Sequence, residues 1–234
     1  LWVRHEIGLI VDTAAGTAEP VDAADVAVHP DGRTALFHVA REDGDTWPWT
    51  WHWRLAVKSP AGQVVSRWEL FTAGGLEVVP RLETWWGPDG ITFTTYITDA
   101  GDIRWWLAVV DPDTGDMRTL AGPAVYVSGL GGGQYLLAGE SGEAPAPWRI
   151  WRPGTGLTDV TLPAELDWRV PAPRVHSLWG EWMVLYVDDA ADPHVARPVV
   201  WRVNSDEWLE LGPVQPLGWY EGTFYWLRAQ GWEP

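Results

Sequence analysis

The stretch that decides the fold is residues 103–122, which read IRWWLAVVDPDTGDMRTLAG. Residues 105–110 are aromatic, aliphatic or β-branched at nearly every position, a composition typical of a strand that is buried on both faces. The next segment, residues 111–115, favours a tight turn because Pro presets φ, Asp caps the turn and Gly accepts positive φ. Residues 117–120 resume as a short strand, so the stretch predicts a β-hairpin.

Weaker copies of this hairpin recur along the whole chain. Turns of the same kind follow hydrophobic runs at residues 12–16, 59–62, 153–156 and 204–207. A second kind of hairpin alternates with the first, and its turns lie at residues 29–32, 87–90, 131–133, 179–181 and 220–222. Each repeat therefore contains four strands, and turns of one kind recur every 40 to 52 residues or so, about the period of β-propeller blades.

The repeats divide the chain into complete units and two incomplete ends. The complete units are expected at about residues 22–70, 79–122, 125–163 and 173–212. The end segments, residues 1–21 and 217–234, would supply the outer and inner strands of one more blade, which removes free sheet edges. The sequence thus predicts one all-β domain. We expect a five-bladed β-propeller of four-stranded antiparallel blades, closed by a blade shared between N- and C-terminal strands. A linear β-sandwich of the same strands is the alternative.

The clearest strand signal in the chain is an alternation of period two. Between residues 49 and 58, one side carries the large apolar residues Trp49, Trp51, Trp53, Leu55 and Val57. The other side carries Thr50, His52, Arg54 and Lys58. Such alternation is typical of a half-buried strand.

Two hairpins resemble a known family of repeats. Residues 29–37, HPDGRTALF, resemble the core motif of TolB-type, WD40-like (PD40-like) propeller repeats, and residues 111–116, DPDTGD, resemble the outer hairpin of those repeats. The Gly-His and Trp-Asp pairs of true WD40 repeats are absent, and these repeats usually build rings of more than five blades. The resemblance implies an exported binding or scaffolding propeller, and it transfers no catalytic residue because the motifs are structural.

Composition excludes several functional classes. The 234 residues include no Cys, which excludes disulfides and thiolate metal sites. The formal net charge of −16 argues against nucleic-acid binding and against adsorption to an anionic membrane. The longest charge-free run, residues 120–139, is interrupted by Pro and Gly, so we expect no membrane insertion within this segment.

The first residue bears on the expected location. The chain begins at Leu1 rather than Met, which suggests a piece of a longer protein whose signal peptide or anchor lies outside it. Together with the resemblance, this leads us to expect an extracytoplasmic protein that is periplasmic, secreted or on the cell surface. The ectodomain of a membrane-anchored protein is one such form.

The long connections between hairpins form the expected binding surface. They would lie on the face opposite the tight turns, and long loops on a rigid scaffold are where binding usually occurs. They comprise residues 41–49, 71–80, 141–147, 163–173 and 188–198, which are mostly acidic. They carry Trp47, Trp49 and Trp168, which can anchor a protein partner or stack on sugar rings, unless their own loops cover them. We therefore expect a non-catalytic binding, scaffold or sensing propeller that engages a protein partner. A carbohydrate-binding propeller that takes a polysaccharide is the first alternative.

A central channel would be lined by residues near the start of each inner strand. These candidate binding residues include Asp25, Glu83, Trp85, His176 and Trp219. Five-bladed glycosidases use carboxylates from several inner strands, and here only Asp25 and Glu83 stand at comparable places, so a glycosidase is the last alternative. A catalytic triad of Ser177, His176 and Asp25 is disfavoured because His176 and Ser177 are neighbours on a strand and face opposite ways. No two His residues stand at the spacing of metal ligands, so we expect no metal site. We also expect no cofactor, and a binding role rather than catalysis.

Overall fold

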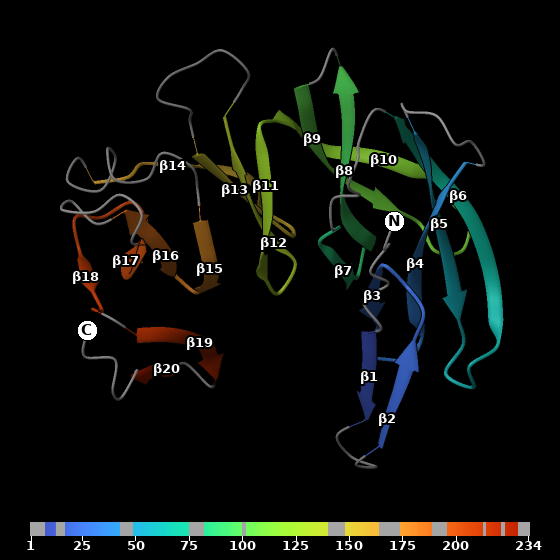
Figure 1. Ribbon diagram of the computed structural model, residues 1–234, viewed down its shortest axis with the longest axis horizontal. Coiled ribbons are helices and arrows are strands. Elements are labelled where there is room, and N and C mark those ends of the chain that lie inside the picture. Colours follow the sequence, from blue (N-terminus) through green and yellow to red (C-terminus); the bar gives the residue numbers. More distant parts are fainter. Residues whose placement is uncertain are drawn as a thin grey trace. The chain divides into compact units, whose positions relative to one another are not determined.

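The computed structural model describes residues 8–12, 17–42, 49–74, 82–99, 102–139, 148–163, 174–188, 196–212, 214–220 and 223–228. Its described elements are antiparallel β-strands (Figure 1). The contacts divide the chain into two compact units, Leu1–Val127 and Ser128–Pro234, and each is described by itself. The expectation of one domain stays a prediction.

The first unit contains one two-stranded sheet and two four-stranded sheets. The two-stranded sheet pairs β1 (Gly8–Asp12) with β2 (Thr17–Val21). The next sheet is a meander of β3 (Asp25–Val28), β4 (Thr34–Arg41), β5 (Thr50–Lys58) and β6 (Val64–Gly74). The following sheet is a meander of β7 (Thr84–Gly87), β8 (Gly90–Asp99), β9 (Asp102–Val110) and β10 (Met117–Ala124). The hairpin predicted for residues 103–122 is confirmed as β9, a turn and β10.

The second unit repeats this pattern, with its boundary falling inside β11. One sheet consists of β11 (Tyr126–Gly131), β12 (Gln134–Ala138), β13 (Trp148–Arg152) and β14 (Gly156–Val160). Another consists of β15 (Arg174–Trp179), β16 (Trp182–Asp188), β17 (Ala196–Arg202) and β18 (Trp208–Glu210). A two-stranded sheet of β19 (Val214–Tyr220) and β20 (Thr223–Arg228) follows. The predicted four-stranded antiparallel sheets are thus confirmed.

Ring closure is not part of the described sheet pairing. The strands β1 and β2 pair only with each other in the described sheets, and so do β19 and β20. No closed sheet occurs among these strands, and the shared fifth blade stays a prediction.

The core of the first unit lies between its two four-stranded sheets. Alternate residues of β5 supply it, and Trp53, Leu55 and Val57 are fully buried whereas Arg54 is exposed, which confirms the predicted alternation. The Phe71 ring stacks on Trp53 at 5.7 Å between ring centroids and meets Tyr96 edge-on at 5.9 Å. These large rings pack because sheets present wide flat layers to one another.

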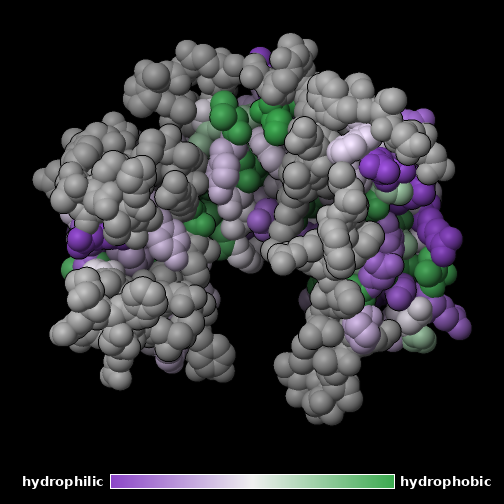
Figure 2. All heavy atoms as spheres, viewed as in Figure 1, coloured by the Kyte–Doolittle hydropathy of each residue, from purple (hydrophilic) through white to green (hydrophobic). Residues whose placement is uncertain are grey.

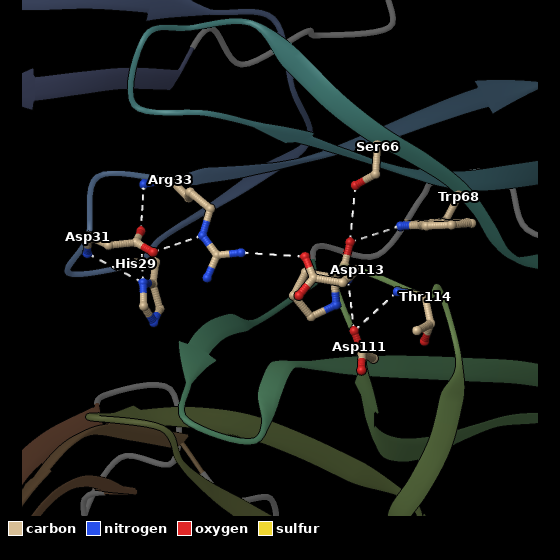
Figure 3. A network of polar contacts seen from close by, with 9 residues as sticks. His29, Asp31, Arg33, Ser66, Trp68, Asp111, Asp113 and Thr114 are labelled. Carbon is tan, nitrogen blue, oxygen red and sulfur yellow. Dashed lines mark hydrogen bonds and ion pairs between the residues drawn. The ribbon is translucent and has the colours of Figure 1, made fainter.

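The turn between β9 and β10 docks on β6 of the neighbouring sheet (Figure 3). Its own shape is set by Asp111, whose Oδ1 accepts the backbone N–H groups of Asp113 at 2.8 Å and Thr114 at 3.2 Å. The Pro112 carbonyl accepts hydrogen bonds from Ser66 Oγ at 3.0 Å and from Trp68 Nε1 at 3.2 Å. The side-chain capping predicted for this turn is confirmed, and the same turn also joins the two sheets.

The turn between β3 and β4 makes a second junction between these sheets. The carboxylate of Asp31 accepts the Arg33 backbone N–H at 2.9 Å and Arg33 Nε at 2.8 Å, and these contacts lower the pKa of Asp31 to about 2. The Arg33 guanidinium lies 5.0 Å from the ring centroid of Trp86 on β7 and 3.6 Å from Asp113 Oδ1. The His29 ring also contacts Trp86, at 5.2 Å between centroids. The motif that resembles a propeller repeat therefore serves packing between sheets.

Candidate functional site

The predicted loop surface lies mostly outside the described residues. Trp47 and Trp168 belong to that part, as do most of the long connections. Trp49 is described and is half-buried, with the Arg41 guanidinium 4.9 Å from its ring centroid. Its indole N–H is buried and has no acceptor among the described residues. The role of this surface in binding stays a prediction.

The predicted channel residues of the first unit lie on neighbouring strands. Asp25 is on β3, Trp85 is on β7, Glu83 immediately precedes β7, and the two strands contact each other. Asp25 Oδ1 accepts the backbone N–H of Val26 at 2.8 Å. The backbone N–H of Glu83 donates to Thr94 Oγ1 at 3.0 Å. All three of the predicted side chains are half-buried.

The predicted channel residues of the second unit are described by their backbone alone. His176 lies at an irregularity in the pairing of β15 with β16, because Val175 pairs with Leu185 and Ser177 pairs with the next residue, Val184. Such an irregularity interrupts the strict alternation that separates His176 from Ser177, and the expected separation stays a prediction. Trp219 lies on β19, where it pairs with Phe224.

A groove lies on the face of the β3–β6 sheet that is opposite the core. Strand register brings its residues together, since Leu36 pairs with Ala56 and Ala56 pairs with Arg67. One row along, His38 pairs with Arg54, which in turn pairs with Glu69. Directly opposed residues of antiparallel strands share a face. The groove has a volume of about 670 Å³, which is within the usual size of ligand sites.

The floor of the groove is apolar. Val21, Leu36 and Ala56 are buried together there, and Ala23 and Val26 pack against them. The segment from Pro20 to Asp22, at the end of β2, forms part of the wall. A ligand in this groove would therefore exchange water for apolar surface on one side.

The rim of the groove carries three cationic side chains and two carboxylates. The cations are Arg54, Lys58 and Arg67, and the carboxylates are Asp22 and Glu69. Arg54 Nε donates to Glu69 Oε2 at 2.9 Å, so this pair is neutralised, and the Arg54 contact together with His52 holds the pKa of Glu69 below its usual value. Lys58 and Arg67 form no ion pair within the described residues, and Lys58 is the only lysine of a sequence whose net charge is −16. Hydrophilic residues gather over β5 and β6 (Figure 2).

His38 on β4 lines the groove, and the groups around it shift its pKa. Burial lowers its pKa below the ordinary value of 6.5, the Asp22 carboxylate opposes this, and the positive charges of Lys58 and Arg67 add to the lowering. The imidazole is therefore neutral at pH 7, and it gains its charge only under more acidic conditions. Below that pKa the groove becomes more cationic.

Sequence reasoning missed this groove although part of its signal was visible. The alternation in β5 places Arg54 and Lys58 on the outward side of the strand. The remaining lining comes from β2, β4 and β6, and nothing local in the sequence joins those segments to one site. The prediction therefore favoured loops, which carry a compositional signal of their own.

No group of three or more His, Asp or Glu side chains within the described ranges is arranged to hold a metal ion. In the same part of the chain, no helix has the length and apolar character needed to cross a membrane.

Comparison with known proteins bears on the fold. The sequence matches no protein-family model. It also matches no curated protein. Among solved structures, an acylaminoacyl peptidase of Pyrococcus horikoshii, which has a β-propeller domain, aligns with a TM-score of 0.54 and 14% identity, over 90% of this chain and 36% of that chain. The fold is compatible with a β-propeller.

A second solved structure, a puromycin-hydrolysing peptidase of Mycobacterium tuberculosis, aligns with a TM-score of 0.46 and 15% identity, over 92% of this chain and 35% of that one. The chain thus spans about a third of the length of either peptidase. At 14% identity, the similarity to the Pyrococcus protein concerns the fold alone.

Proposed function

We propose that this chain is a non-catalytic binding module whose groove on the β3–β6 sheet takes an acidic segment of a protein partner. The observation that carries the proposal is the placement of Lys58 and Arg67, which form no ion pair within the described residues, above a buried apolar floor. Complementary charge gives specificity and a faster association rate, and apolar contact supplies affinity. An acidic segment with alternating apolar side chains satisfies both parts of the groove.

The ionisation of the groove favours binding over acid–base catalysis. A general acid needs a carboxyl whose pKa is raised, whereas the Arg54 guanidinium lowers the pKa of Glu69. A cationic His38 would also be needed to donate a proton, and burial acts against that form. The acidic long-loop face predicted from the sequence remains a second candidate surface for the same partner-binding function.

The test uses the single lysine as a chemical handle. We expect the acetylated hexapeptide ELELEL to bind, and a zero-length carbodiimide cross-linker to join its carboxylates to Lys58. Substituting Lys58→Gln and Arg67→Gln together should weaken binding on the order of tenfold or more, because two charge contacts are lost. Protonation of His38 under acidic conditions adds a positive charge, so binding should tighten as the pH falls for as long as the glutamates of the peptide stay ionised. Fluorescence anisotropy of the labelled peptide measures the affinity.

The matched control is Arg118→Gln, which removes one exposed guanidinium on β10 of the other sheet and should leave the affinity unchanged. The peptide KLKLKL, acetylated in the same way, should not bind the groove. Equal affinity for ELELEL in the double variant and in the unchanged protein would refute the proposed function.

We further propose that β1–β2 and β19–β20 are the two halves of a fifth blade that closes the propeller. Each is a two-stranded sheet in the described pairing, and isolated two-stranded hairpins are marginal in water. Pairing them would remove the free edges of both.

Deleting residues 1–16, which removes β1, is expected to lower the melting temperature by on the order of 5–10 °C. It should also accelerate amide hydrogen exchange in β19 and β20, which a purely local effect in the first unit would not do. Deleting only residues 1–5 leaves β1 complete and serves as the control. Unchanged exchange in β19 and β20 after the longer deletion would contradict the shared blade.

A further inference from the structure

Two tryptophans stand exposed at the end of the β15–β16 hairpin. Trp179 and Trp182 are directly opposed in the strand register, and the two-residue connection between them is Gly180-Glu181. Their exposed fractions are 48% and 37%, whereas the next opposed pair of the hairpin, Leu178 and Met183, is buried. Large exposed aromatic surface of this kind is uncommon away from interaction sites.

The fold does not require side chains at these two positions. The β7–β8 hairpin has the same two-residue connection, and its opposed pair at the turn is Gly87 and Gly90. One step further from each turn, both hairpins bury an apolar pair. In the β15–β16 hairpin that pair is Leu178 and Met183. The buried pair already packs the hairpin against the sheet interior, so packing does not need the two indoles. Trp179 and Trp182 are therefore available for binding.

The charged groups beside the two indoles have a net negative charge. Arg202 lies opposite Trp182 on β17, and its guanidinium contacts Glu181 at 3.0 Å and Glu207 at 3.4 Å. These carboxylates raise the pKa of Arg202 and fix the guanidinium in place. Two carboxylates therefore contact one cation beside Trp182, and the charge of this cluster is negative.

The chain itself shows which chemistry suits such rings. The Arg33 guanidinium lies over Trp86 at 5.0 Å from the ring centroid, and the Arg41 guanidinium lies over Trp49 at 4.9 Å. Within the described residues, neither Trp179 nor Trp182 has a cation over its ring. A guanidinium or ammonium group is attracted to the face of an indole, and nearby carboxylates add to that attraction.

We propose that Trp179 and Trp182, with Glu181 and Glu207, form a binding site for an arginine or lysine side chain from a basic segment of a partner. The charge of this site is opposite to that of the groove on the β3–β6 sheet, and it takes ligands of the opposite sign. The proposal stands independently of the groove because it rests on other residues in the second unit.

The test compares a basic probe with neutral and acidic ones. The acetylated peptide GRGRG, labelled for anisotropy, is expected to bind the unchanged protein, whereas GEGEG and the neutral sugar cellohexaose are not. Replacing both indoles by leucine (Trp179→Leu with Trp182→Leu) keeps apolar bulk but removes the aromatic face, and should weaken GRGRG binding on the order of tenfold. Replacing both by phenylalanine should retain part of the affinity, because a weaker aromatic face remains.

Control substitutions separate this site from general surface effects. Leu209→Ala removes an exposed apolar side chain of the same sheet, and it should leave the affinity for GRGRG unchanged. Glu181→Gln should weaken binding and reduce its salt dependence. The groove variant Lys58→Gln with Arg67→Gln should bind GRGRG as well as the unchanged protein does, so failure of one proposal is distinguishable from failure of the other.

A measurement on the unchanged protein guards against variants that fold poorly. The indole N–H signals of Trp179 and Trp182 should shift when tetramethylammonium chloride is added, and should stay in place with the same concentration of sodium chloride. Equal affinity of the leucine variant and the unchanged protein for GRGRG would overturn the proposal. Cellohexaose binding that is lost in the leucine variant would overturn it too, since the platform would then belong to sugars.

Discussion

Replacing Trp53 by alanine is expected to lower the free energy of unfolding of the first unit by about 3–5 kcal/mol. The side chain is fully buried at the centre of the core between the two four-stranded sheets. Phe71 stacks on it at 5.7 Å, and its Nε1 donates to the Tyr96 hydroxyl at 3.4 Å. Removing the indole leaves a cavity that the surrounding rings cannot fill, because sheet backbones hold them in place.

Urea unfolding followed by circular dichroism measures this effect. The comparison variant is Trp179→Ala, whose side chain is about half exposed, and its cost should be about 1 kcal/mol or less. Trp53→Phe should fall between the two, since it keeps a ring but loses volume and the N–H donor. A smaller loss for Trp53→Ala than for Trp179→Ala would show that the core is not organised around Trp53.

Replacing Gly115 by alanine is expected to destabilise the first unit by about 2–4 kcal/mol, the next largest effect. Gly115 has a φ of +80°, a conformation that disfavours residues with a Cβ. An added Cβ would lie 2.6 Å from two atoms of the Trp68 indole, whose N–H is engaged with the Pro112 carbonyl. The new methyl group would therefore push the turn away from β6 and break the junction between the sheets.

The chain offers a matched control for the backbone part of this effect. Gly62, in the turn between β5 and β6, has a φ of +78°, and an added Cβ would meet nothing within 4 Å. Gly62→Ala should therefore cost only the backbone strain, about 1 kcal/mol. The same urea measurement serves both variants, and similar losses for the two would mean that contact with Trp68 contributes nothing.

The turns and many strands could be predicted because their information is local. Asp111 caps its own turn through hydrogen bonds to residues two and three positions ahead, so the motif carries its geometry wherever it occurs. The alternation around Trp53 likewise fixes which side of β5 is buried. These signals were sufficient for the strand order within each four-stranded sheet.

Sequence-based prediction of side-chain direction is limited where strand pairing departs from regular alternation. At His176 the register of β15 against β16 shifts by one residue, which the sequence did not predict. The pairing of β5 with β6 shifts twice, next to Arg54 and next to Lys58. Such shifts redirect side chains, and they depend on the partner strand rather than on the residues alone.

The candidate sites follow the same division. The sequence showed that Trp is abundant, but burial distinguishes a packing indole such as Trp53 from an exposed one such as Trp182. It placed Lys58 on the outward side of a strand, but Arg67 reaches the same groove only through the register of β6. Neither distinction has a local sequence signal, because both depend on which segments pack together.

The sequence by itself determined the all-β class, the repeating hairpins and the buried side of β5, since turn chemistry and side-chain alternation act over a few residues. Only the tertiary structure decided how the turn at Asp111 docks on Trp68, where the cations of the groove meet, and which indoles remain exposed. The physical reason is that hydrogen bonding and φ preference are properties of short segments, whereas burial and charge clustering are properties of segments brought together by strand register.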